Sequence, residues 1–216
     1  MTLSFDKNAV CVLCKLTQDG ECIGIGTGFF FMEDDLVATC KHIMEDHAKN
    51  QVPYSLVIRP SQSTEGCLAV QCVYHIEQDM ALIKLERRYH VRPFVPCIGT
   101  NNGFTYVGFD PLSRSLVVRH IPTFYTPDAW EGSHSTIYFF EWDGSLTPGN
   151  SGGPLIGSDG GVAGMLIGFS SQVDRSDKVQ TAQSRARAIF TGPLTDLYLR
   201  WKFDTDSLRI VENPFT

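Results

Sequence analysis

The feature that most constrains this chain is a succession of short strand-like runs separated by turn residues. The runs are rich in β-branched and aromatic residues, and clusters of Gly, Asp and Ser punctuate them, which is typical of all-β proteins. Twelve strands are expected, at residues 10–16, 28–32, 36–39, 54–58, 68–74, 80–85, 105–109, 115–120, 136–141, 153–156, 162–170 and 187–190.

Helical periodicity is weak until the end of the chain. There, Pro193 opens a segment with apolar residues at positions 194, 197, 198 and 201. This i, i+3, i+4, i+7 spacing predicts one helix over about residues 193–202, docked by a single face. A dozen strands and one C-terminal helix suit two small barrels or a sandwich.

Charge and hydropathy exclude several classes of function. The net charge is −6 and Lys and Arg are not clustered, which argues against a nucleic-acid ligand. The longest apolar stretch, residues 23–32, contains three glycines and is far shorter than the roughly 20 residues of a membrane span. The first residues lack the basic and apolar regions of a secretory signal. We therefore expect neither nucleic acid nor a membrane as a partner.

Seven cysteines lie in the first half of the chain, at positions 11, 14, 22, 40, 67, 72 and 97. Their odd number, without a secretion signal, predicts free thiols in a reducing, cytoplasmic compartment. Cys11 and Cys14 have the spacing of a zinc knuckle, but no second pair follows and the run resembles a strand. We expect no metal and no cofactor.

The strongest chemical signal is the segment Gly149-Asn150-Ser151-Gly152-Gly153. Glycines around a serine let backbone N–H groups converge on one point, as an oxyanion hole requires. A glycine-rich hairpin turn is the plain alternative. The spacing also matches the nucleophile elbow of α/β-hydrolases, but no histidine follows the serine and alternating helices are missing, which excludes that fold.

A base and an orienting acid must then precede Ser151, in the order His, Asp, Ser. His42 follows two expected strands, and Asp79 begins an apolar run where a partly buried carboxylate needs a partner such as an imidazole N–H. Glu77 lies on the same strand face and is the substitute for Asp79. His75 shares that face and is interpreted as a structural or surface histidine.

Taken together, three motifs resemble the trypsin/chymotrypsin-like serine peptidases, and the likeness is greatest to the HtrA/Deg-type intracellular peptidases. The motifs are Thr39-Cys40-Lys41-His42-Ile43, Asp79-Met80-Ala81-Leu82-Ile83-Lys84-Leu85 and Gly149-Asn150-Ser151-Gly152-Gly153-Pro154-Leu155. The Gly-x-Gly-Phe start, the Asn before the serine and Val107-Gly108-Phe109 are further HtrA-like features. The resemblance spans roughly residues 8–202.

This resemblance implies two six-stranded antiparallel β-barrels of chymotrypsin-like fold, with the active site in the cleft between them. The peptidase domain would cover residues 1–202, with barrels over about 8–92 and 103–191, a helix over about 193–202 and a short tail at 203–216. We expect no PDZ domain in this chain. The implied site has His42 as base, Asp79 as its orienting acid, Ser151 as nucleophile, and the N–H groups of Gly149 and Ser151 as oxyanion hole.

The implied function is a serine endopeptidase that cleaves protein or peptide substrates through an acyl-enzyme; a pseudoprotease that binds peptides or partners is the alternative. Asn150 replaces the Asp with which secreted trypsins pair a new N-terminus, so maturation by that route is not expected.

Ser145 would form the base of the substrate pocket, with Ile167 and Gly168 on its wall, which favours uncharged substrate side chains; Asp143 is the alternative residue at the base. The polar stretch 169–187 predicts a loop through which a regulatory protein partner could act.

Overall fold

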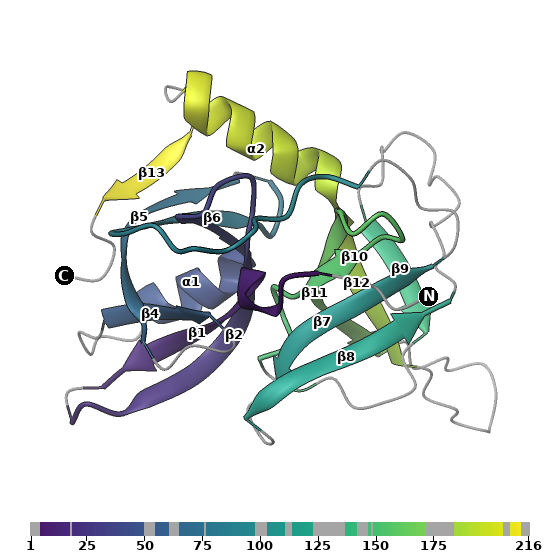
Figure 1. Ribbon diagram of the computed structural model, residues 1–216, viewed down its shortest axis with the longest axis horizontal. Helices are drawn as coiled ribbons and strands as arrows, with labels where there is room; N and C mark the ends of the chain where they lie inside the picture. Colours follow the sequence, from purple (N-terminus) through teal and green to yellow (C-terminus); the bar gives the residue numbers. More distant parts are fainter. Residues whose placement is uncertain are drawn as a thin grey trace.

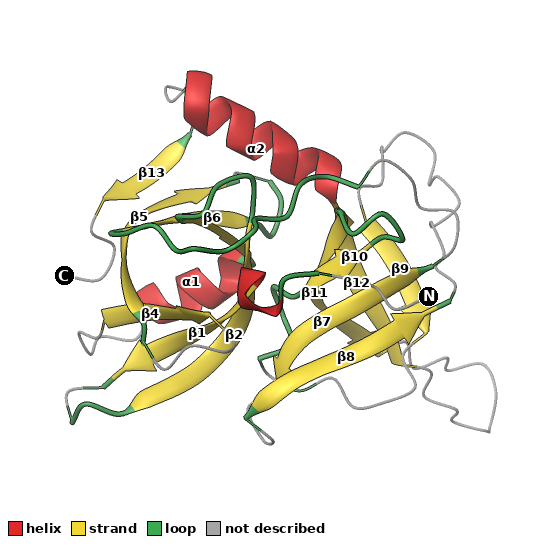
Figure 2. Ribbon diagram, in the orientation of Figure 1, coloured by secondary structure: helices red, strands yellow, loops and turns green. Residues whose placement is uncertain are grey.

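Two β-sheet units lie side by side, and one helix, α2 (Thr191–Phe203), passes over both (Figure 1). The computed structural model describes residues 5–17, 19–49, 55–60, 65–75, 77–97, 103–110, 114–122, 137–141, 147, 149–171, 184–204 and 208–212. Strands are the main secondary structure of the described residues (Figure 2). The all-β class with a C-terminal helix is therefore confirmed. Within the described residues, no helix has the length and apolar character needed to cross a membrane.

The first unit is a closed barrel of six antiparallel strands. Pairing runs in the order β5-β4-β1-β2-β3-β6, and β6 then pairs back onto β5. The strands are β1 (Val10–Leu16), β2 (Cys22–Phe30), β3 (Leu36–Thr39), β4 (Ser55–Pro60), β5 (Cys67–Tyr74) and β6 (Ala81–Leu85). Closure satisfies strand edges that would otherwise be open to pairing with another chain.

Large side chains fill the interior of this barrel. Phe29 is fully buried and its ring meets that of Phe94 edge-on, with centroids 6.0 Å apart. Gly28 makes this packing possible, because a Cβ there would lie 2.7 Å from Val37 and 2.8 Å from Leu13. The Gly-x-Gly-Phe sequence is thus a packing requirement, in which the glycine leaves room for core side chains.

The second unit is a six-stranded antiparallel sheet in the order β8-β7-β10-β11-β12-β9. Its strands are β7 (Phe104–Asp110), β8 (Ser115–Ile121), β9 (Ile137–Glu141), β10 (Pro154–Ile156), β11 (Val162–Ser171) and β12 (Ser184–Phe190). Its core includes Tyr106, Leu155 and Leu166, all of which are buried. The described part of this unit thus holds the six strands expected for the second barrel.

Three elements were not expected from the sequence. A short 3-10 helix, η1 (Lys7–Ala9), precedes β1, and α1 (Lys41–Lys49) follows β3. The third is β13 (Arg209–Glu212), which pairs antiparallel with β5, so part of the expected tail returns to the first barrel. The α1 segment carries too few apolar positions for a clear helical period. The four residues of β13 form a strand because the distant strand β5 offers an edge.

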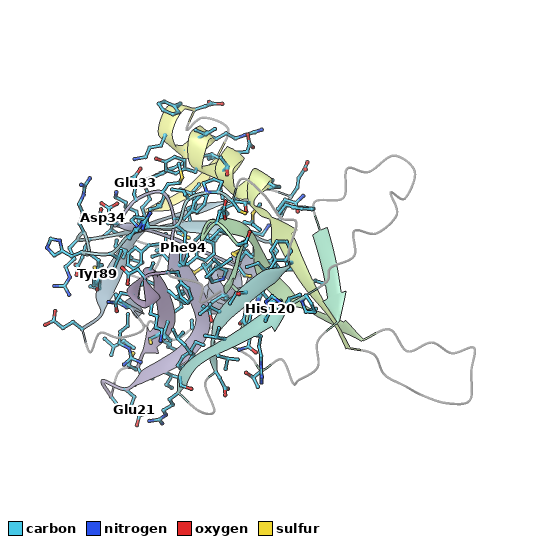
Figure 3. The ribbon with its side chains drawn as sticks, turned by 45° about the vertical axis from the view of Figure 1, so that its right-hand side comes forward. Glu21, Glu33, Asp34, Tyr89, Phe94 and His120 are labelled. Atoms are coloured by element: carbon cyan, nitrogen blue, oxygen red, sulfur yellow. The ribbon has the colours of Figure 1, made fainter. Side chains whose placement is uncertain are left out.

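Glu33 ties α2 to the first barrel. Its carboxylate accepts a hydrogen bond from the Tyr198 hydroxyl at 2.9 Å and lies 2.6 Å from the Lys202 ammonium and 3.7 Å from that of Lys84. Figure 3 shows Glu33 beneath this helix. Burial tends to raise the pKa of Glu33, but the hydrogen bonds from Lys202 and Tyr198 outweigh burial and lower it below its usual value.

We predict that Glu33→Gln lowers the free energy of unfolding at pH 7 by about 1–2 kcal/mol, because a charged acceptor is lost. Folding lowers the pKa of Glu33, so the ionised side chain stabilises the fold above the ordinary value of 4.5 and this stabilisation is lost as the pH falls below it. Urea titrations at pH 7 and pH 3 measure the difference. The control, Glu21→Gln, alters an exposed turn residue (Figure 3) and should match wild type at both pH values.

Candidate active site

His42 and Asp79 meet at one end of the β3–β6 pair. Thr39 pairs with Ala81, so the residues that follow β3 and those that precede β6 come together. Asp79 Oδ1 accepts the backbone N–H of His42 at 2.8 Å, and Oδ2 lies 2.7 Å from His42 Nδ1. An ionised carboxylate only accepts hydrogen bonds, so Nδ1 carries the proton and Nε2 is left as an acceptor.

The electrostatics keep this acid charged. Burial by itself would raise the pKa of Asp79, but the hydrogen bonds from the His42 ring and backbone, together with the Lys41 charge, lower it below its usual value. Asp79 is therefore ionised at neutral pH and holds the imidazole in one tautomer. The His42 side chain is 41% exposed, so the ring can be reached from solvent.

Ser151 lies in a loop that ends at β10 and that requires glycine at two of its positions. Gly149 has a φ of 114° and Gly152 a φ of 88°. A Cβ on Gly152 would lie 2.0 Å from the carbonyl oxygen of Thr27. The glycines in the sequence motif therefore serve a backbone conformation and a close approach that other residues cannot provide.

The same loop leaves two N–H groups available. The N–H groups of Asn150, Gly152 and Gly153 all donate backbone hydrogen bonds. Those of Gly149 and Ser151 donate to no other described residue. These are the two donors that the sequence assigned to an oxyanion hole.

Thr27, which the sequence reasoning missed, joins the serine loop to the first barrel. It is fully buried in β2. Its N–H donates to the Ser151 carbonyl at 2.9 Å and its hydroxyl donates to the Gly149 carbonyl at 2.6 Å. Its hydroxyl also accepts the Phe109 N–H at 2.8 Å, and its carbonyl accepts the Thr39 hydroxyl at 2.8 Å. The sequence shows its place between two glycines, but neither its burial nor its partners.

A second connection runs through Leu166 in β11. Its carbonyl accepts the Gly152 N–H at 2.8 Å and the Cys40 thiol at 3.3 Å. Cys40 lies two residues before His42, and Gly152 directly follows Ser151. The histidine segment and the serine loop therefore meet at one backbone carbonyl.

Asn150 stabilises the serine loop through hydrogen bonds of its side chain and its main chain. Its side-chain amide donates to the Phe109 carbonyl at 2.9 Å, and its side-chain oxygen accepts the Thr147 N–H at 2.9 Å. The Tyr106 hydroxyl donates to its main-chain carbonyl at 2.9 Å. A carboxylate could accept but not donate, so the amide suits this position.

Of the residues predicted to form the substrate pocket and the regulatory loop, the structure describes only some. Ser145 and Asp143 lie outside the described residues, as does most of the 169–187 stretch. Ile167 and Gly168 lie half-buried in β11, at a bulge where the pairing with β12 shifts by one residue. They directly follow Leu166, so the structure places them beside the serine loop.

His75 has a structural contact of the kind expected. Its Nδ1 accepts the backbone N–H groups of Glu77 at 3.2 Å and Gln78 at 3.0 Å. The ring therefore shapes the turn that leads into Asp79. Asp79, and not Glu77, is the acid that contacts His42.

Comparison with known proteins identifies the family. The model for the trypsin-like peptidase domain matches residues 26–165, and the chain belongs to this family. The chain is 25% identical to the serine protease HhoA of Synechocystis over 184 residues, which are 73% of the chain and 42% of that protein. It is also 25% identical to a DegP-like periplasmic serine endoprotease of Marinomonas over 166 residues, which are 72% of the chain and 31% of that protein. The chain thus spans less than half the length of these curated relatives.

Solved structures share the fold. The Rv3671c protease of M. tuberculosis in its active form has a TM-score of 0.61 at 19% identity, covering 89% of this chain and 80% of that one. An HtrA-type protease, AlgW, has a TM-score of 0.65 at 15% identity, covering 94% and 62%. Mouse neuropsin has a TM-score of 0.62 at 19% identity, covering 92% and 95%. These likenesses establish the chymotrypsin-like fold expected from the sequence.

We predict that Thr27→Val destabilises the protein by about 2–4 kcal/mol, because the Gly149 carbonyl and the Phe109 N–H both lose a buried partner. It should also slow labelling of Ser151 by a fluorophosphonate by about 10–100-fold, because the loop is misplaced. Denaturant unfolding and labelling rates, the latter at a temperature where every variant is folded, measure the two effects.

Two further variants separate positioning from stability. Thr27→Ser keeps the hydroxyl and should restore labelling. Thr191→Val removes another buried hydroxyl, which donates to the Val162 carbonyl at the start of α2. It should lower stability and leave the labelling rate of the folded protein unchanged. Equal labelling of Thr27→Val and wild type would refute the positioning role.

Proposed function

We propose that this chain is a serine endopeptidase that hydrolyses peptide bonds through His42, Asp79 and Ser151. The observation that carries the proposal is the double hydrogen bond between Asp79 and His42, which prepares Nε2 to accept a proton. A glycine-formed loop, tied to the same barrel through Thr27, presents Ser151 with two available N–H groups. Membership of the trypsin-like family supports the same reaction.

The proposed reaction follows from these roles. Ser151 Oγ attacks the substrate carbonyl while His42 Nε2 takes its proton, and Asp79 stabilises the imidazolium that results. The N–H groups of Gly149 and Ser151 bind the oxyanion, a contribution of about 3–4 kcal/mol per donor in enzymes of this type. His42 then protonates the leaving amine, and water hydrolyses the acyl-enzyme by the same steps in reverse order.

A pseudoprotease that binds peptides or partners is the second candidate. A binding module needs the fold, but not an imidazole oriented by a partly buried carboxylate. The His42–Asp79 geometry therefore favours turnover. A regulatory protein partner, and a role for the 169–187 stretch in its action, remain predictions.

We predict that Ser151→Ala and His42→Ala each lower peptide hydrolysis by about 10⁴–10⁶-fold, because triad members act as a unit. Their urea midpoints should stay close to that of wild type. A quenched fluorescent peptide assay measures turnover, and circular dichroism follows unfolding. Ser115→Ala and His90→Ala, at exposed positions, serve as controls that retain activity. Wild-type turnover in Ser151→Ala would end the assignment.

We propose that the enzyme prefers substrates with an uncharged, mainly apolar side chain on the residue just before the cleaved bond. Ile167, a half-buried apolar residue that packs against the core beside the serine loop, supports this preference. Burying an unpaired cation against such a wall would cost several kcal/mol, whereas differences of one methylene shift the preference by only about 1–3 kcal/mol.

A peptide library should therefore show apolar residues of graded size before the cleaved bond. Cleavage profiled by mass spectrometry measures the preference. A profile dominated by Arg or Lys would contradict it and assign the pocket charge to Asp143.

We propose that the protein works where thiols stay reduced, which is the cytoplasm. The structure pairs none of the seven cysteines in a disulfide, and Cys11, Cys40 and Cys72 are fully buried. Rapid acid quenching of cells, followed by maleimide labelling under denaturing conditions, should add seven labels to each chain. Recovery of chains with fewer labels, restored by reductant, would show an oxidising compartment.

A further inference from the structure

Behind the proposed catalytic pair, Cys40 completes a cluster of three different ligand atoms. Its sulfur, a ring nitrogen of His42 and a carboxylate oxygen of Asp79 all lie within 4.8 Å of one another. It is the one group of this kind among the residues that the structure describes. The proposed peptidase reaction uses His42 and Asp79 and leaves the thiol without a role.

The donor set has a clear metal preference. Thiolate, imidazole and carboxylate together suit Zn²⁺, which binds them at about 2.0–2.3 Å in tetrahedral geometry. Three protein ligands leave the fourth position for water. Hard cations such as Mg²⁺ and Ca²⁺ favour oxygen donors and would gain little from the sulfur.

We propose that Cys40, His42 and Asp79 form an inhibitory Zn²⁺ site within the active centre. The ion would sit between the sulfur, His42 Nδ1 and the Asp79 carboxylate. Ligand atoms around one tetrahedral zinc ion lie more than about 3 Å apart, and His42 Nδ1 and Asp79 Oδ2 are 2.7 Å apart. Zinc binding therefore has to open the hydrogen bond that orients His42.

The proton balance explains the inhibition. In the metal-free protein the Cys40 thiol keeps its proton, which it donates to the Leu166 carbonyl at 3.3 Å. Zinc displaces the thiol proton to solvent and binds the thiolate. The neutral His42 ring changes tautomer, giving Nδ1 to the metal and carrying its proton on Nε2. An Nε2–H cannot accept the Ser151 proton, so the nucleophile loses its base.

Burial and exposure around the cluster are compatible with entry of an ion. The side chains of His42 and Asp79 are 41% and 30% exposed, whereas Cys40 is fully buried beneath them. Zinc can first contact these two partly exposed ligands and then reach the sulfur. The Leu166 carbonyl, which now accepts the thiol hydrogen bond, lies next to the site.

The first experiment measures metal binding directly and does not depend on peptidase activity. Co²⁺ replaces Zn²⁺ as a coloured probe, and a cobalt–thiolate absorption band near the ultraviolet edge should appear on titration. Cys40→Ala should lose this band and weaken Zn²⁺ binding, measured against a competing chelator, by at least about 100-fold, because losing an outer partner already costs about 10–100-fold. Cys72→Ala, fully buried in β5 of the same barrel, is the matched control and should bind as wild type does.

The second experiment measures inhibition, which rests on the proposed function. Zn²⁺ should stop peptide hydrolysis by wild type and by Cys72→Ala, and a chelator should restore it. Cys40→Ala and Cys40→Ser, each compared with its own rate without zinc, should require at least about 10-fold more Zn²⁺. Mg²⁺ should have no effect on any of them.

The cobalt titration tests the metal site, and the hydrolysis assay tests the peptidase, so each proposal can be contradicted without the other. A Cys40-dependent cobalt band in a protein without turnover would support the metal site and contradict the peptidase. A cobalt band that persists unchanged in Cys40→Ala, or equal zinc inhibition of wild type and Cys40→Ala, would overturn the site. Both Cys40 variants should show wild-type circular dichroism, and Cys40→Ser covers the case in which Cys40→Ala fails to fold.

Discussion

The architecture of the active centre depends on the buried hydrogen bonds of Thr27. Its N–H, hydroxyl and carbonyl are all used, and their partners lie in β3, in β7 and in the serine loop. A buried polar group left without a partner costs about 1–3 kcal/mol of folding free energy. Breaking any of the four hydrogen bonds of Thr27 would therefore destabilise the fold. Through them, the loop that carries Ser151 is registered against the barrel that carries His42 and Asp79.

The two halves of the site are built on different principles. His42 and Asp79 belong to one barrel and are aligned by the β3–β6 pairing, so their contact is complete within that unit. Ser151 approaches from the second sheet, and its loop is shaped by glycines and by the buried Asn150. Cys40 lies where these halves meet, since its thiol reaches the carbonyl that also holds Gly152. This position gives a buried thiol access to the oriented imidazole, which is why a metal bound there would act on the base and not on the fold.

Most of the framework could be predicted from the sequence, and the misses have physical causes. The strands over residues 10–16 and 36–39 coincide with β1 and β3, because short apolar runs with β-branched residues, bounded by turn residues, are local signals. The segment that forms α1 carries too few apolar positions for a periodic pattern, and β13 depends on the edge of β5. Thr27 was not singled out from the sequence, because only its hydrogen-bond partners reveal its role. The base of the substrate pocket, assigned to Ser145 by position alone, lies beyond the described residues.

The sequence by itself determined which reactive groups are present and their order along the chain: a histidine after a strand, an aspartate before another, and a serine among glycines. Two of these glycines have a positive φ, which other residues rarely adopt. Only the tertiary structure decided which groups meet. The hydrogen bond from Thr27 to Gly149 spans 122 residues of chain. Local propensity acts over a few neighbouring residues and carries no information about such a pair. The contact forms because packing the two β units removes water from both groups, and each then needs the other as its hydrogen-bond partner.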